Sequence, residues 1–303
     1  MAESRGPLRR LEAGVLLPLA ALLRRLGPRR RVAIGRRLGL LVHRVDAGHR
    51  EVARRNLRQA LGLDEVEAAR LAREVFAHFG RVLAECLALP AYAAPGAAAL
   101  FEVEGLEHLA RAHARGRGVI VVSAHFGNWE LIGVRQALAG YPMDFIARPL
   151  DNPWMEAALR KWREQVGNRV LGKHGALRQG LRTLREGRAL AFMVDQSMRV
   201  PPRLFVPFFG RHAPVSPAMG HLAARTGAAV VPVVSFPRDD GGYRIVYEPE
   251  LVAAPGSDPE NAARELMRRA TARVEDWVRQ QPQAWLWMHD RWKWPPHPGE
   301  ELL

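Results

Sequence analysis

The stretch 118–131, GVIVVSAHFGNWEL, constrains the fold most, because an apolar run in it ends at a polar turn and a helix start. Val119–Val122 is continuously apolar, which is typical of a strand buried on both faces of a sheet. Similar runs recur along the chain with helical stretches between them, and this alternation predicts an α/β fold. We therefore expect a mixed, mostly parallel central sheet with helices on both faces.

The expected strands are short, and those at 118–123, 189–194 and 228–235 are almost continuously apolar. They are 101–104, 118–123, 143–147, 189–194, 228–235 and 243–248. Helix starts are expected where a capping side chain precedes proline, at Asn152, Ser216 and Asp258. A long amphipathic helix is expected over 64–89, where apolar residues recur at helical spacing.

Residues 1–62 read as basic helices, and 13–23 form an apolar run with arginines on both sides. This run is too short to cross a bilayer, which takes about 20 apolar residues, and no signal-peptide cleavage site follows it. We expect a membrane-associated segment over 1–62, with arginines on lipid phosphates, and a second domain over 63–303. A buried helix with solvated arginines at its ends is the alternative.

The formal net charge of the 303 residues is +14. Such an excess requires a polyanionic partner: nucleic acid, anionic lipid or a phosphorylated substrate. Cys86 is the only cysteine, so an intrachain disulfide is impossible and a reducing compartment is indicated. The chain lacks a Gly-x-Ser-x-Gly elbow, a Walker loop and a Gly-x-Gly-x-x-Gly loop. These absences argue against a serine hydrolase and against a nucleotide as the main substrate.

His125 and Glu130 flank a strand-to-helix turn and suggest a general base with a carboxylate that orients it. Gly127 permits close backbone approach, and N–H groups at the helix start near Asn128 are suited to stabilise an oxyanion. A structural histidine and a metal ligand are the rival interpretations. Because no His/Cys cluster lies nearby, we expect neither a metal nor another cofactor.

Arg148 and Asp195 each follow an expected strand directly, as His125 does. Ligands of parallel sheets bind beyond the carboxyl ends of the strands, so these three residues should share one rim. Arg148 would hold an anionic group or oxyanion there. An ordinary turn at 148–153 and a structural ion pair of Asp195 are the alternatives.

The C-terminal run 285–294, WLWMHDRWKW, holds four of the eight tryptophans. Aromatic and basic residues together fit a membrane interface, RNA stacking, or a strand that closes the core. No established nucleic-acid motif accompanies them, and we expect no nucleic-acid partner.

Together these motifs resemble the bacterial lipid A biosynthesis acyltransferases, within the lysophospholipid and glycerol-phosphate acyltransferase superfamily. The residues that carry the resemblance are HFGNWEL at 125–131, RPLDNP at 148–153, Asp195-Gln196, 209–217, Thr226-Gly227-Ala228 with Pro232, and HDRWK at 289–293. They span nearly the whole chain in the order and spacing of that family. The His–Glu motif is shared across the superfamily, whereas HFGNWE and His-x-Arg-Trp-Lys are more specific to this branch.

The resemblance implies a glycerol-phosphate acyltransferase-like fold at the cytoplasmic face of a bacterial inner membrane, monotopic or with one N-terminal anchor. It implies acyl transfer from acyl-acyl carrier protein or acyl-CoA to a hydroxyl of a phosphorylated glycolipid, a lipid A precursor. His125 and Glu130 would be catalytic and no acyl-enzyme would form. The expected substrate-binding residues are Gly127, Asn128, Arg148, Asp195, Gln196 and Arg291.

Three alternatives remain open. Acyltransferases acting on mannosylated phosphatidylinositol share the same motifs, so this acceptor or another phospholipid is the first alternative. A non-catalytic binder of anionic lipid or nucleic acid would explain the charge and the tryptophans, but not polar residues at three strand ends. A thioester hydrolase is the third alternative.

Overall fold

The computed structural model describes residues 6–172, 175–300 and 302–303. Four helices open the chain, α1 (Gly6–Arg25), α2 (Pro28–Val45), α3 (Ala47–Leu61) and α4 (Glu65–Leu87), and the short α5 (Leu89–Tyr92) and 3₁₀ helix η2 (Pro95–Leu100) follow. The later helices are α6 (Leu106–Ala114), α7 (Trp129–Leu138), α8 (Pro153–Glu164), α9 (Ala176–Arg185), α10 (Ala218–Thr226), α11 (Pro259–Gln280) and η3 (Pro282–Ala284).

Seven strands form one sheet in the order β1-β9-β8-β2-β5-β3-β4. They are β1 (Phe101–Glu104), β2 (Val119–Ser123), β3 (Met143–Ile146), β4 (Arg169–Leu171), β5 (Ala189–Met193), β8 (Ala229–Pro237) and β9 (Tyr243–Tyr247). All neighbouring pairs are parallel except β8 and β9. The expected mixed, mostly parallel sheet is confirmed.

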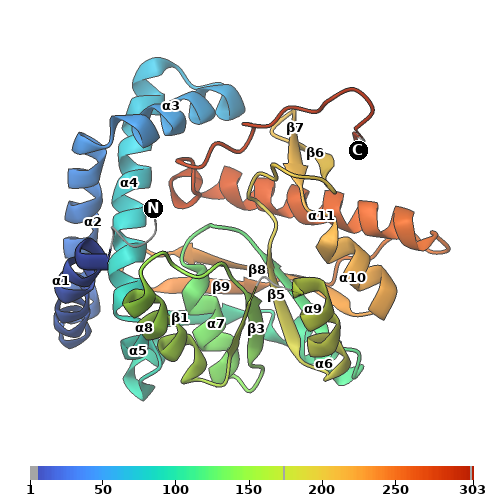
Figure 1. The fold of residues 1–303 in the computed structure, drawn as a ribbon, viewed down its shortest axis with the longest axis horizontal. Coiled ribbons are helices and arrows are strands. Elements are labelled where there is room, and N and C mark those ends of the chain that lie inside the picture. Colours follow the sequence, from blue (N-terminus) through green and yellow to red (C-terminus); the bar gives the residue numbers. More distant parts are fainter. Residues whose placement is uncertain (1–5, 173–174, 301) are drawn as a thin grey trace.

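Helices cover both faces of this sheet, as expected. Alternate residues of β2 belong to different cores: Ile120 and Val122 pack with α9, α10 and α11, whereas Val119 and Val121 pack with α6 and α7. Because successive side chains of a strand point to opposite faces, this division places one helical layer on each side. Figure 1 shows the layers, with α11 lying across one face and α7 on the other.

The expected long helix is α4, which begins at a capping box of Asp64 and Glu67. It is the centre of the N-terminal helices, because α1, α2 and α3 all pack against it (Figure 1). Glycines permit the close approach of α2 and α4: a Cβ on Gly39 would lie 2.0 Å from the Phe76 carbonyl oxygen. The proposed boundary between 1–62 and 63–303 stays a prediction.

Among the described helices, none combines the length and the apolar character that crossing a membrane requires.

Several strands were not predicted from the sequence. β4 has only three residues, and the hairpin of β6 (Leu204–Phe208) and β7 (Arg211–Val215) carries prolines in both strands. The run 285–294 forms no strand; it crosses the molecule irregularly and touches the sheet layer through a bridge between Phe126 and Trp285. Trp285, Trp287 and Trp292 are buried, so for these three neither a membrane interface nor RNA stacking fits.

Candidate active site

His125 and Asp195 meet at the carboxyl ends of β2 and β5. These strands pair with Ser123 opposite Met193, so the residues two positions further along each chain lie level with one another. The Nδ1 atom of His125 donates to Oδ1 of Asp195 at 2.9 Å, and the His125 backbone N–H donates to Oδ2 at 2.8 Å. The expected common rim is therefore present for this pair.

Both groups of this pair have shifted pKa values. Burial alone would raise the pKa of the Asp195 carboxyl, but the charge and hydrogen bond of His125, together with Trp285, lower it to about 2. Burial alone would lower the pKa of His125, but Asp195, with a smaller contribution from Glu130, raises it above the ordinary 6.5. The carboxylate is thus ionised at neutral pH and stabilises an imidazolium.

The ionised Asp195 fixes the tautomer of the imidazole, since a carboxylate accepts and Nδ1 must carry the hydrogen. The other nitrogen, Nε2, then has a free lone pair, which accepts from the amide of Gln196 at 3.3 Å. Gln196 is exposed, so a substrate hydroxyl can replace its amide. An imidazole with a fixed Nδ1–H and an accessible Nε2 is suited to take a proton.

Two aromatic side chains hold the pair in place. The indole Nε1 of Trp285 donates to Oδ2 of Asp195 at 2.9 Å. The ring of Trp129, the first residue of α7, lies edge-on to the imidazole with 4.9 Å between centroids. Sequence reasoning left Trp285 out of the site, because no local pattern connects it with residue 195.

The expected contact between Glu130 and His125 is wrong. Glu130 accepts two hydrogen bonds from Arg163 of α8, at 2.6 and 2.9 Å, and both side chains are largely buried. At the first turn of α7 its carboxylate points toward α8, not toward Nδ1. Glu130 therefore affects the imidazole only through its charge, and its catalytic role stays a prediction.

The turn between β2 and α7 is held from behind by α4. His78 donates from Nε2 to the Gly127 carbonyl at 3.1 Å; burial lowers the pKa of His78 to about 3, so its ring is neutral. Glu85 accepts from the Asn128 side-chain amide at 2.9 Å, from Arg81 and from the Tyr243 hydroxyl. Asn128 thus fixes the turn and is itself fully buried.

Gly127 is required by this packing. Its φ is +57°, and a Cβ there would lie 1.7 Å from the Ser235 carbonyl oxygen. Its N–H donates to the Ala284 carbonyl and that of Asn128 to the Ser235 hydroxyl, so neither is free for an oxyanion, contrary to expectation. Trp129 and Glu130 are the first two residues of α7. Among the described residues, no acceptor is bound to their backbone N–H groups, which therefore remain available for an oxyanion.

The two arginines assigned to substrate binding lie in different surroundings. Arg148 follows β3 at the rim, but its side chain is 72% exposed and contacts Asp151, not His125. Its binding role stays a prediction. Arg291 is completely buried and donates to the carbonyls of Gln196 and Pro214, and its substrate-binding role also stays a prediction. It supports the backbone that carries Gln196.

His289 was not among the site residues expected from the sequence. Its Nε2 accepts from the Ser197 N–H at 2.9 Å, so the hydrogen lies on Nδ1. Because Ser197 follows Asp195 by two residues, this hydrogen bond places the His289 ring beside the site. Burial lowers the pKa of His289, while the charge of Asp195 acts to raise it.

Across the described ranges no group of three or more His, Cys, Asp or Glu side chains is arranged to hold a metal ion. The site offers proton transfer by an imidazole and backbone N–H donors at a helix start. That combination is typical of a class of enzymes that activate a hydroxyl or a water by general-base catalysis.

Comparison with known proteins specifies the class. A family model for bacterial lipid A biosynthesis acyltransferases matches residues 10–294. The chain is 29% identical over 273 residues to the lipid A biosynthesis palmitoleoyltransferase of Escherichia coli K12, covering 89% of this chain and 87% of that protein. It is 29% identical over 197 residues to the lauroyltransferase of the same organism, covering 64% and 62%.

A phosphatidylinositol mannoside acyltransferase of Mycolicibacterium smegmatis is also 29% identical, over 252 residues that cover 80% of this chain and 81% of that protein. Since the family model matches nearly the whole chain, the protein belongs to the bacterial lipid A biosynthesis acyltransferase family. It is an acyltransferase, and the resemblance of its motifs to this family is confirmed.

Proposed function

We propose that the protein transfers a fatty acyl chain from a thioester, acyl-acyl carrier protein or acyl-CoA, to a hydroxyl of a phosphorylated glycolipid, a lipid A precursor. The observation that carries this proposal is the His125–Asp195 pair, which leaves Nε2 free to accept a proton beside a helix start with unused N–H groups. The palmitoleoyl- and lauroyltransferases among the relatives support this acceptor.

In the proposed reaction, Nε2 of His125 removes the hydroxyl proton as the oxygen attacks the thioester carbonyl. The resulting oxyanion is stabilised by the N–H groups of Trp129 and Glu130; such a donor is typically worth about 3 kcal/mol. The tetrahedral intermediate then collapses, the C–S bond breaks, and the imidazolium returns its proton to the thiolate. Because the thioester is already activated, no acyl-enzyme is required.

We propose that α1 and α2 lie on an anionic membrane surface, at the cytoplasmic face of a bacterial inner membrane. Each helix has a stripe of exposed large apolar side chains at helical spacing: Leu8, Leu11, Val15 and Leu22 on α1, and Leu38, Leu41, Val42 and Val45 on α2. Arginines accompany both stripes. Apolar residues in the interface and arginines at phosphate level are typical of monotopic helices.

A second acceptor has specific support. The mycolicibacterial relative is a phosphatidylinositol mannoside acyltransferase at the same identity as the lipid A enzymes. A mannosylated phosphatidylinositol is also an anionic glycolipid, so the positive charge of this chain suits it equally well.

Mass spectrometry tests these proposals: purified protein is incubated with a mixed pool of acyl donors and either lipid A precursor or mannosylated phosphatidylinositol. Acylated precursor is expected, with activity lost in His125→Ala. Free fatty acid as the sole product, with or without acceptor, would show a hydrolase. A His125→Ala variant that kept more than about a tenth of the rate would exclude His125 as the base, since such groups contribute about 10²–10⁴-fold.

A further inference from the structure

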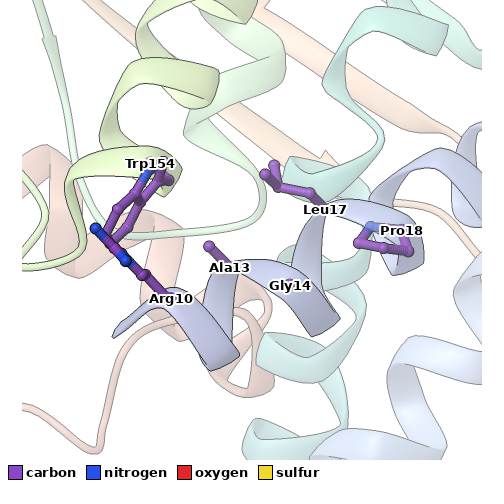
Figure 2. Close-up of a pocket in the computed structure, with 6 residues that line it drawn as sticks. All are labelled: Arg10, Ala13, Gly14, Leu17, Pro18 and Trp154. Carbon is purple, nitrogen blue, oxygen red and sulfur yellow. The ribbon is translucent and has the colours of Figure 1, made fainter. Parts of the chain in front are cut away.

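A groove lies between α1 and the start of α8, apart from the His125–Asp195 pair. Its volume is about 490 Å³, within the roughly 300–1,000 Å³ usual for ligand sites. Its lining is mainly apolar and comes from one face of α1 together with one aromatic side chain of α8: Arg10, Ala13, Gly14, Leu17, Pro18 and Trp154. Figure 2 shows Arg10 beside the indole of Trp154, and Leu17 and Pro18 further along α1.

The two walls of the groove are fastened together at Asn152, which is buried. Its amide nitrogen donates to the Arg9 carbonyl at 2.8 Å and to Glu12 at 3.0 Å, both on α1. Its amide oxygen accepts from the N–H groups of Trp154 and Met155 and so caps α8. The N-terminal helix is thus docked on the segment that leaves the carboxyl end of β3.

The same wall is fastened to the catalytic turn. Arg163, near the end of α8, forms the two hydrogen bonds with Glu130 at the start of α7. Glu130 lies five residues after His125, so α8 connects the groove to the site through one buried ion pair. Parallel strands carry their ligands beyond their carboxyl ends, and α8, which contributes Trp154 to the groove, follows the carboxyl end of β3.

Charge and access indicate what occupies the groove. The Arg10 guanidinium lies 5.7 Å from the centre of the Trp154 ring, at the polar end of an otherwise apolar lining. An amphiphile with an apolar chain and an anionic headgroup complements this pattern. Gly14 lines the groove and the next residue, Val15, belongs to the exposed apolar stripe of α1, so the groove adjoins the surface proposed to face the membrane.

We propose that this groove binds one acyl chain of the anionic glycolipid acceptor, with the phosphorylated headgroup near Arg10. The proposal rests on the proposed function, since it assigns a subsite to the same acceptor. It gives α1 a role in substrate binding in addition to membrane contact.

Gly14→Leu is the decisive variant. A Cβ on Gly14 meets nothing within 4 Å, so a leucine side chain has room to enter the groove. Leucine also favours a helix more than glycine does, so folding is preserved. Ala21→Leu is the matched control, because it adds bulk at an exposed position of the same helix outside the groove.

The first measurement needs no turnover. Dodecyl phosphate below its micellar concentration is titrated while tryptophan emission is followed, with Trp154→Phe identifying the contribution of Trp154. Saturable binding is expected in the wild type and in Ala21→Leu, and at least tenfold weaker binding in Gly14→Leu. Arg10→Gln should weaken dodecyl phosphate but not uncharged dodecyl maltoside. Equal binding of dodecyl phosphate by the wild type and by Gly14→Leu would overturn the proposal that this groove binds an acyl chain.

The second measurement is acyl transfer in detergent solution. Gly14→Leu is expected to raise the KM for the acceptor at least tenfold and to leave the KM for the donor unchanged. An unchanged acceptor KM together with weaker vesicle binding would show that the groove holds bulk lipid and would overturn the assignment to the acceptor. Absence of transfer in the wild type, with saturable dodecyl phosphate binding retained, would instead refute the proposed function.

Discussion

Asp195→Asn should reduce kcat/KM by about 10²–10⁴-fold without unfolding the protein. The drop of the Asp195 pKa from 3.8 to about 2 corresponds to roughly 2–3 kcal/mol in favour of the carboxylate, since one pKa unit is worth about 1.4 kcal/mol. If the imidazolium that forms during catalysis loses this support, the rate falls by roughly two orders of magnitude.

The hydrogen bonds around Asp195 give a second reason why Asp195→Asn should lose activity. Oδ2 accepts from the His125 N–H and from Trp285, so the single oxygen of an asparagine is best placed there. Its NH₂ group then faces Nδ1 and requires that atom to accept. The ring hydrogen moves to Nε2, which can no longer take a proton; the same change in a serine-protease triad costs about 10⁴-fold.

The assay is acyl transfer as a function of pH, with Glu130→Gln measured in parallel. Glu130→Gln breaks the pair with Arg163 but leaves Nδ1 untouched, so it should cost less activity and more stability. Because Asp195 raises the His125 pKa, the acid limb of any residual activity in Asp195→Asn should lie at lower pH than in the wild type. If folded Glu130→Gln loses more kcat/KM than Asp195→Asn, the orienting role given to Asp195 is wrong.

Three further outcomes are expected. Gln196→Ala should keep activity within about tenfold, since its amide only occupies Nε2 until substrate arrives; a loss as large as that of His125→Ala would contradict this. Wild-type unfolding free energy should fall between about pH 4 and pH 2, where the low-pKa Asp195 protonates, and chemical denaturation of Asp195→Asn should show a weaker fall. Glu85→Leu should destabilise the protein by about 3–5 kcal/mol, because Arg81 keeps its charge in a buried site; a near-neutral change in thermal unfolding would count against that network.

The sheet was predictable because its signal is local. The expected strands are short segments with apolar residues either in a run or alternating with polar ones, and all six were found within about two residues of their expected ends. The shared rim of His125 and Asp195 followed from the same rule on strand ends. β4 and the β6–β7 hairpin were missed because a three-residue strand and strands containing proline carry little of that signal.

The partner of the imidazole was assigned wrongly because the nearer carboxylate in sequence was preferred. Which carboxylate reaches Nδ1 depends on the register between β2 and β5, which joins residues 70 positions apart. The direction of the Glu130 side chain depends likewise on where α8 packs. The burial of Arg291 and of three tryptophans reflects the final packing of the chain. Composition alone left a membrane interface, RNA stacking and a strand that closes the core open for the tryptophans.

The hydrogen bonds of the segment 285–291 have a consequence for the order in which the molecule becomes functional. Trp285 holds Asp195, Leu286 donates its N–H to the His125 carbonyl, and Asn56 of α3 donates to the carbonyls of Trp287 and His289. The catalytic pair therefore gains its last supports only when this late segment has been synthesised and has docked. By then α1 and α2 have long left the ribosome, so the helices proposed to contact lipid are available well before the His125–Asp195 pair is complete.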